Sequence, residues 1–521
     1  MSDVDDLLGN SNLGNAIGII VGETSALNFR FLIGDETGRG AYVKVRDVSG
    51  GWILAHVEDV TRSNAAYNLN QVDKKKNTVA RERMVGTAKV IGLAANGKLL
   101  IPTTPPRPGD HVLMADDALI KRALGLSKGN LYIGLLDRRN LKVKLDANTL
   151  VQKHCSILAK TGSGKSYTAA VVLEELLEKN VALLIIDPHG EYVSMKDKNS
   201  EGDFARYDIK PRGYDVTIYS PAYQGVNPNA DKAFRFDGKN LTAREITGLF
   251  PDDVTDSQMG VLYEAIKALG VEKENYYLED IISQAEKDTS KAKWGLIRRM
   301  EALVDLGIFS GRPTKSKDLL RRGKASVMDM TGVPPDLQGM IVAKLLTDLF
   351  DARKRGRVSP GMVVIEEAHN YIPERGSGKA ASTGIIRTIA AEGRKFGLGL
   401  LVISQRPARV DKNVISQCNT QIILRVTNPN DLRALSKGIE GMSADLEEDI
   451  MRLPPGTVML VSNEIERPVT VNIRPRKSKH GGISPPIIAS GNKSDEGKGP
   501  KEPPKSEKKT GGSLLRKILG K

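Results

Sequence analysis

Residues 159–167 read Ala-Lys-Thr-Gly-Ser-Gly-Lys-Ser-Tyr, an order of glycine, lysine and hydroxyl side chains that suits a bound phosphate. A short apolar segment ending in Leu158 precedes them, and a predicted helix begins at Lys165. Glycines let backbone N–H groups converge on one point, and the helix N-terminus adds partial positive charge. Lys165 would reach the β- and γ-phosphates, and the Ser166 hydroxyl would bind Mg²⁺. The pattern therefore predicts a nucleoside triphosphate site.

The usual form of this motif begins with glycine where this chain has Ala159. Alanine can make the same turn if its φ stays negative, so we treat this as a tolerated departure. The predicted nucleotide-binding residues are Ala159, Lys160, Thr161, Gly162, Ser163, Gly164, Lys165, Ser166 and Tyr167.

A second motif, Gly361-Met-Val-Val-Ile-Glu-Glu-Ala-His-Asn, begins with four apolar residues and continues into two adjacent carboxylates. Such a buried strand would emerge at the carboxyl edge of a parallel sheet, where ligands bind in α/β proteins. Two neighbouring anions repel each other unless a cation or a reacting water uses them. We expect Glu366 to hold Mg²⁺, through water, and Glu367 to polarise the attacking water. A strand that simply leaves the core is the alternative.

Two further clusters follow predicted strands. Asp187-Pro-His-Gly-Glu-Tyr offers Asp187 and Glu191 to support magnesium or the nucleophilic water, with His189 beside them, although an ordinary turn would also explain it. Gln405 follows the apolar run Leu398–Ser404 and can hydrogen-bond a γ-phosphate without adding charge. Arg394, in Ala-Glu-Gly-Arg-Lys-Phe-Gly, has the rigid and always charged fork that an arginine finger needs.

The 521 residues carry a net charge of +14, which favours a polyanionic partner. From Arg474 to the end, 13 Lys and Arg stand against 4 Asp and Glu, so this segment holds nine of those charges and the rest of the chain is only weakly basic. We find no apolar run of membrane-spanning length and no signal peptide, which predicts a cytoplasmic protein without a membrane partner. Cys155 and Cys418 lack metal or disulfide spacing and are predicted to be buried thiols.

The pattern of apolar residues changes along the chain. Short β segments separated by Gly, Asn and Asp predict an N-terminal barrel or sandwich over residues 1–120. Strands alternating with amphipathic helices predict an α/β core over 121–239 and 313–474, and helical periodicity predicts an insertion over 240–312. Residues 475–521 are rich in Lys, Pro, Gly and Ser and are predicted to be a disordered basic tail.

The motifs D-P-H-G-E-Y, I-E-E-A-H-N and G-R-K-F-G followed by S-Q-R-P resemble the HerA branch of the HerA/FtsK superfamily of ring-forming DNA motors. The resemblance covers the N-terminal region, which is similar to the HAS barrel of that family, and a RecA-like P-loop motor through about residue 474. It implies that Lys165 and Ser166 bind ATP and Mg²⁺ and that Glu366 and Glu367 are the acidic pair. Gln405 would then be the sensor, and Arg394 would act on the ATP of a neighbouring subunit.

The family further implies a hexameric ATPase that translocates on double-stranded DNA and acts with the nuclease NurA in resecting broken ends. A conjugation-type coupling ATPase and a ring clamp that binds ATP only to assemble are the alternatives. A ring motor grips the phosphate backbone with basic pore loops. The candidate DNA contacts are Arg375, Lys379, Lys196 and Lys198.

Overall fold

The computed structural model describes residues 16–34, 37–64, 67–68, 71–72, 82–95, 98–126, 128–222, 225–250, 253–305, 307–438 and 444–481. The predicted disordered tail lies outside these ranges from residue 482 onward, and so does its apolar group Leu514, Leu515, Ile518 and Leu519.

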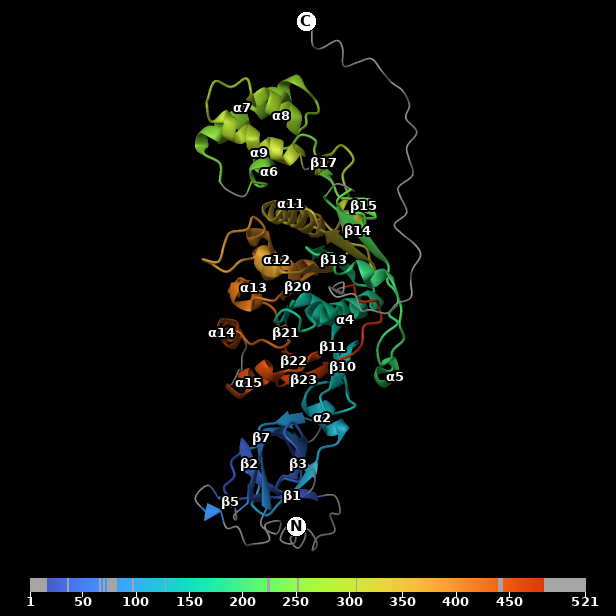
Figure 1. Ribbon diagram of the computed structural model, residues 1–521, viewed down its shortest axis with the longest axis vertical. Coiled ribbons are helices and arrows are strands. Elements are labelled where there is room, and N and C mark those ends of the chain that lie inside the picture. Colours follow the sequence, from blue (N-terminus) through green and yellow to red (C-terminus); the bar gives the residue numbers. More distant parts are fainter. Residues whose placement is uncertain are drawn as a thin grey trace, which may run out of the picture. The chain divides into compact units, whose positions relative to one another are not determined.

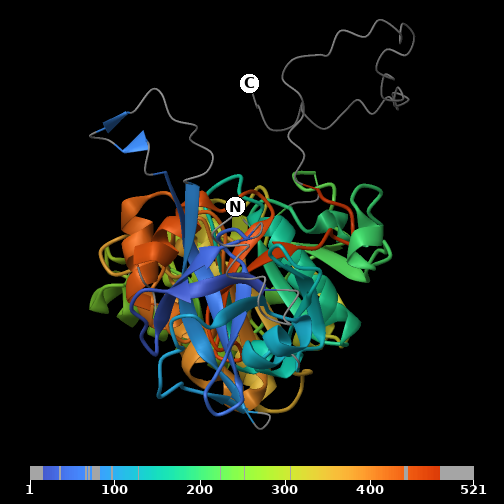
Figure 2. The same cartoon turned by 90° about the horizontal axis from the view of Figure 1, so that it is seen from below.

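Six strands close into the predicted N-terminal barrel, shown in blue in Figures 1 and 2. Their order is β2-β1-β9-β3-β4-β7, and the pairing of β2 with β7 joins the two ends. Phe29 and Phe31 of β2 point into the barrel core, and Gly86 of β7 lies so close to the Phe31 ring that a Cβ there would approach it to 2.6 Å. The strands are β1 Ala16–Val21, β2 Asn28–Ile33, β3 Tyr42–Arg46, β4 Trp52–Asn64, β7 Glu82–Ala95 and β9 His111–Met114, with β5 Tyr67–Asn68, β6 Gln71–Val72 and β8 Lys98–Leu100 beside them.

A twelve-stranded mixed sheet forms the core in the order β11-β10-β23-β22-β21-β12-β20-β19-β13-β18-β14-β15. The strands from β21 to β15 are parallel to one another, and β22, β23, β10 and β11 extend the sheet antiparallel. The strands are β10 Leu131–Leu136, β11 Lys142–Leu145, β12 Cys155–Leu158, β13 Ala182–Asp187, β14 Val216–Ser220, β15 Lys232–Ala233, β18 Ala325–Asp329, β19 Gly361–Ile365, β20 Leu398–Ser404, β21 Thr420–Ile423, β22 Thr457–Ser462 and β23 Val469–Ile473. This α/β core confirms the predicted fold class.

Helices cover both faces of this sheet (Figure 1). The sheet's strands divide their side chains between two apolar clusters, one containing α4 and the other containing α11 and α12. A sheet buried on both faces explains why its strands read as continuous apolar runs. The helices are α2 Asp117–Ala123, α3 Ala147–Gln152, α4 Lys165–Glu178, α5 Phe204–Tyr207, α10 Ser316–Leu319, α11 Pro335–Lys354, α12 Thr383–Phe396, α13 Lys412–Ile415, α14 Pro429–Gly438 and α15 Ala444–Arg452, with short turns η2 Val193–Lys196, η3 Ala368–Asn370 and η4 Pro407–Arg409.

The predicted helical insertion contains α6 Ala243–Thr247, α7 Asp256–Glu272, α8 Leu278–Ala285 and α9 Lys293–Asp305, and the small ladder β16 Phe236–Asp237 with β17 Phe309–Ser310 joins its two ends. Capping boxes at Thr242 and Thr255 fix where α6 and α7 begin. Among the helices that the structure describes, none is long and apolar enough to cross a membrane.

The chain beyond β23 departs from the sequence expectation. Residues 475–481 belong to the predicted basic tail, yet Arg476 and Ser478 are fully buried, as is Arg474 just before them. These residues lie alongside α4 and donate hydrogen bonds to its side chains. Their basic composition serves buried ion pairs, so it does not mark the start of a solvated segment.

Candidate nucleotide site

Strand register brings the predicted motifs to one edge of the sheet. Leu158, the last residue before the phosphate loop, lies opposite Ser404, which precedes Gln405. On β13 and β19, Ile186 lies opposite Ile365, so Asp187 and Glu366 follow at the same level. Because these strands are parallel, all of their carboxyl ends meet here, as expected for a ligand site.

The phosphate loop takes the conformation that its glycines allow. Gly162 and Gly164 have φ values of 76° and 93°, which a residue with a Cβ adopts only under strain. Ala159 is not among the described residues with positive φ, and its N–H donates to the Ser404 carbonyl at 3.2 Å. The alanine therefore makes the turn as predicted. α4 begins directly after Gly164, so its free N–H groups face the loop.

Lys165 lies between the two carboxylates of the acidic strand. Its Nζ donates to Glu366 Oε1 and, at 2.9 Å, to Glu367 Oε1. Burial lowers the pKa of Lys165, but the charges of Glu366 and Glu367 outweigh burial and leave this pKa raised. The lysine is thus held as an ammonium at the edge where phosphate groups would arrive.

Glu366 is completely buried, and its second oxygen accepts a hydrogen bond from the Tyr192 hydroxyl at 2.7 Å. Burial raises the pKa of Glu366, with Lys165 acting against it. Asp187, also fully buried, accepts three backbone N–H groups, from His189, Gly190 and Tyr192. Burial raises the pKa of Asp187 to about 7 against the effect of the Tyr192 N–H.

Glu367 has the geometry of a strained functional residue. Its φ is +49°, which costs a non-glycine residue on the order of 1 kcal/mol and is common at active sites. Its Oε2 is buried without a hydrogen-bond partner in the described part of the chain. His369 Nδ1 lies 3.4 Å from this oxygen, within ion-pair distance but without hydrogen-bond geometry. Burial lowers the pKa of His369, although the Glu367 charge opposes this. The free oxygen can accept a proton from a water molecule.

Gln405 contacts the phosphate loop directly, because the Thr161 hydroxyl donates to its Oε1. A change in the loop on nucleotide binding would therefore reach the end of β20 through one hydrogen bond. Glu191, named with His189 as a supporting residue, has a buried Oε2 that also lacks a hydrogen-bond partner among the described residues.

The donor set suits a magnesium ion that arrives with a nucleotide. No group of three or more His, Cys, Asp or Glu side chains among the described residues could hold a metal on its own. Mg²⁺ commonly takes one or two protein ligands and completes its shell with phosphate and water. The Ser166 hydroxyl and Glu367 Oε2 make no hydrogen bond within the described residues. Both oxygens of Glu366 are occupied by Lys165 and Tyr192, so Glu366 would bind Mg²⁺ only after Lys165 moves to the phosphates.

Arg394 lies away from its own phosphate loop. It is in the last turn of α12, four residues before β20 begins at Leu398, and the loop is level with the other end of β20. Its exposed side chain makes no hydrogen bond or ion pair with the residues that the structure describes.

The four candidate DNA contacts lie outside this cluster. Arg375 and Lys379 are exposed on the segment between η3 and α12, and Lys198 is exposed after η2. Lys196 is already paired with Asp231 at 2.7 Å.

Sequence reasoning did not select two residues of the site. Asp329 is a buried carboxylate opposite Asp187 on β18, and the Tyr192 hydroxyl holds Glu366. A signal for Asp329 is present, since it lies one residue before the end of the predicted strand Ala325–Met330. The sequence around Tyr192 gives no sign that its hydroxyl contacts Glu366, which is 174 positions away.

The parallel sheet, the glycine-bounded loop before α4 and the acid pair after β19 are the features of a P-loop NTPase with a RecA-like core. Residues 131–349 match the family described as "Helicase HerA, central domain". A probable helicase from Methanocaldococcus jannaschii is 29% identical over 89% of this chain and 92% of its own length. The DNA double-strand break repair helicase HerA of Pyrococcus furiosus is 28% identical over 89% of this chain and 93% of its own. The chain is thus similar to these helicases over about nine tenths of its length, and its central part matches the HerA central domain.

Among solved structures, VirB4 of Thermoanaerobacter pseudethanolicus aligns with 67% of this chain and 97% of its own, at 16% identity and a TM-score of 0.49.

Proposed function

We propose that this protein hydrolyses ATP to move along double-stranded DNA as a ring-forming translocase or helicase, with a role in processing broken DNA ends. The observation that carries the proposal is the contact of Lys165 with Glu366 and Glu367 at the edge of the sheet that holds the phosphate loop. In a chain similar to known helicases, this arrangement would supply the charge, the general base and the nucleotide loop that phosphoryl transfer needs.

In the proposed reaction Lys165 leaves the two carboxylates and neutralises the β- and γ-phosphates. Its departure frees Glu367 to accept a proton from the attacking water. Ser166 and Glu366 would hold Mg²⁺, which supplies charge neutralisation at the phosphates when bound. Gln405 would report the state of the γ-phosphate through Thr161. Asp187, with Tyr192, would keep Glu366 in place.

The oligomer is part of the same proposal. Arg394 lies at the opposite end of β20 from its own loop, so an arginine finger at this position serves a neighbouring subunit. We propose that the protein forms a hexamer in which Arg375, Lys379 and Lys198 contact the phosphate backbone of DNA. This hexamer would work with a NurA-type nuclease. Lys196 is a weaker candidate because Asp231 neutralises it. The cytoplasmic location stays a prediction.

ATP turnover measured with and without linear duplex DNA tests the proposal, with Lys165→Ala as the inactive control. We expect turnover that rises with duplex DNA, together with displacement of a third strand from a triplex substrate. Turnover without displacement would favour a coupling ATPase that needs other components. ATP binding and ring assembly without turnover would establish the clamp instead.

A further inference from the structure

The first residues after β23, here named the C-terminal strap (residues 474–481), are bound along the phosphate-loop helix α4. All five N–H groups of the Arg474 guanidinium have acceptors. Two of the acceptors are carboxylates of α4, Glu174 at 3.0 Å and Glu175 at 2.9 Å. The others are the backbone carbonyls of Tyr132, Val171 and Pro475.

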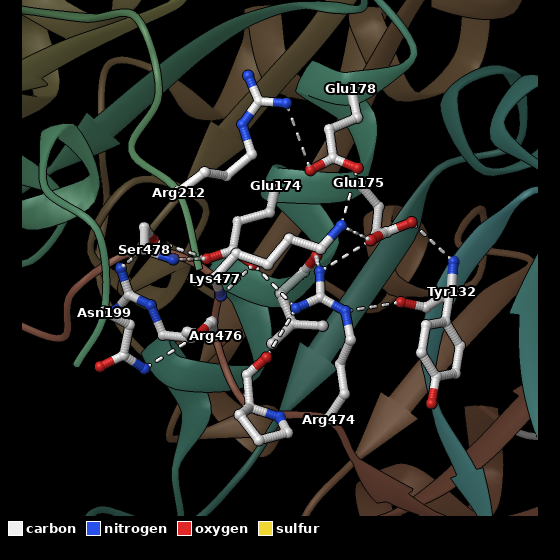
Figure 3. A network of polar contacts seen from close by, with 12 residues as sticks. Tyr132, Glu174, Glu175, Glu178, Asn199, Arg212, Arg474, Arg476, Lys477 and Ser478 are labelled. Carbon is white, nitrogen blue, oxygen red and sulfur yellow. Dashed lines mark hydrogen bonds and ion pairs between the residues drawn. The ribbon is translucent and has the colours of Figure 1, made fainter. Parts of the chain in front are cut away.

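Lys477 and Ser478 complete this network (Figure 3). Lys477 Nζ donates to Glu175 and Glu178 at 2.8 Å each. The N–H groups of Lys477 and Ser478 and the Ser478 hydroxyl all donate to Glu174. Glu174 thereby accepts four hydrogen bonds while fully buried.

Three carboxylates lie near the end of α4, and the two buried ones are unfavourable without the strap. They lie in the last turns of a helix, where the dipole disfavours negative charge. Two of them, Glu174 and Glu175, are buried, and a buried carboxylate is tolerated only when it is paired. The position of α4 is therefore tied to the position of the strap.

The strap also contacts two segments beside the nucleotide site, the first turn of α4 and η2. On one side, the Arg476 N–H donates to the Tyr167 hydroxyl at 2.9 Å, one residue after Ser166. On the other side, the Ser194 hydroxyl donates to the Lys479 carbonyl, and the Lys479 N–H donates to the Asp197 carbonyl, both at 2.9 Å. Ser194 belongs to η2, which directly follows Tyr192.

We propose that the C-terminal strap positions the groups that hydrolyse ATP, with Arg474 and Lys477 as its positioning residues. The strap holds α4, which carries Lys165 and Ser166, at a fixed distance from η2 and so from the Tyr192 hydroxyl that orients Glu366. This inference rests on the proposed ATPase function. Displacement of reacting groups by about 1 Å can cost on the order of a hundredfold in rate, so a loosened strap lowers turnover more than it lowers nucleotide binding.

Two lysines of the strap make a matched test. Lys477 is buried in the network, whereas the Lys479 side chain is exposed and its ammonium makes no hydrogen bond or ion pair with the described residues. In the full-length chain, Lys477→Met should lower kcat by about ten- to a hundredfold with KM for ATP changed less than about threefold. Lys479→Met removes the same charge and should keep both wild-type constants.

A merely structural strap predicts a different result. Lys477→Met would then melt at a lower temperature but keep wild-type kcat when assayed well below that temperature, and this would overturn the proposal. Tyr167→Phe supplies a second variant that keeps the ring and removes one strap contact at the phosphate loop. It should lower kcat by about three- to tenfold, the rate equivalent of a single hydrogen bond.

If Lys477→Met fails to fold, the kcat of Tyr167→Phe tests the proposal instead. A kcat of Tyr167→Phe within about twofold of wild type would refute positioning by the strap. These outcomes are separate from failure of the proposed function. A wild-type protein that does not hydrolyse ATP contradicts the function itself, whereas an active wild type with unaffected strap variants contradicts only this inference.

Discussion

Arg394→Ala should remove almost all ATP turnover while leaving ATP binding nearly unchanged. The reason is the position of Arg394 at the amino end of β20, with its own phosphate loop level with the carboxyl end. A seven-residue strand spans about 20 Å at roughly 3.3 Å per residue. An arginine side chain is too short to cross that distance, so the residue can contact a nucleotide only on another subunit.

The size of the loss in ATP turnover distinguishes two roles of Arg394, an arginine finger that contacts the nucleotide of a neighbouring subunit and a charge that acts only over a long distance. Across about 20 Å of water, one unit charge changes the energy of another by only about 0.2 kcal/mol, which is less than a twofold change in rate. A finger in contact with the transferring phosphoryl group is worth on the order of a thousandfold, or about 4 kcal/mol. We therefore expect turnover to fall by about a thousandfold in Arg394→Ala.

Mixed assemblies provide the assay. A Lys165→Ala subunit has no working site of its own but keeps Arg394, which it can lend to an Arg394→Ala neighbour whose phosphate loop is intact. Rings assembled from the two variants should hydrolyse ATP, although each variant alone is inactive. Mass spectrometry of the intact assembly would verify mixing. If verified mixed rings recover no turnover, Arg394 does not act between subunits and the reasoning from β20 is refuted.

Four other changes give separate expectations. Glu367→Gln should bind nucleotide and assemble but hydrolyse ATP about a hundredfold or more slowly, and normal turnover would remove Glu367 as the base. The barrel carries no phosphate motif and is expected to serve assembly or partner docking. A chain starting near residue 116, which removes the barrel and keeps α2, β10 and β11, should therefore lose stable rings or nuclease stimulation, and normal assembly and DNA movement would contradict this role. A chain ending after Gly481 should bind DNA more weakly with a flatter salt dependence, and an unchanged slope would exclude DNA contact by the tail. Because the folded protein favours protonated Asp187, its stability without nucleotide should fall as pH rises from about 4 to about 7, and Asp187→Asn should flatten that dependence in pH-dependent unfolding.

Much of the site could be predicted because its signals are local. The apolar runs before Glu366 and Gln405 predict buried parallel strands, and the carboxyl ends of such strands must share an edge. Glycines at 162 and 164 predict the loop, because only glycine readily takes the positive φ found there. The alternation of strand and helix likewise predicted the core sheet and the helical insertion.

Barrel closure is a result of the tertiary structure. The long strand β7 was not among the segments that the sequence indicated, yet its pairing with β2 removes the free edges. Its buried positions include the small residues Gly86, Ala88 and Gly92, so its apolar periodicity is weak. The pairing with β2 places Gly86 against the Phe31 ring, a contact that the local sequence does not show.

The same holds for the charges around the nucleotide loop. The sequence places Lys165 and Glu366 in motifs 201 residues apart, and only the folded sheet shows that they are paired without nucleotide. Local composition predicts that Arg476 and Lys477 begin a solvated tail, directly after Arg474 at the end of the core. Their burial depends on Glu174 and its neighbours on α4, some 300 positions earlier in the chain. Whether a charged residue is solvated or buried depends on its partner in space, which composition cannot supply.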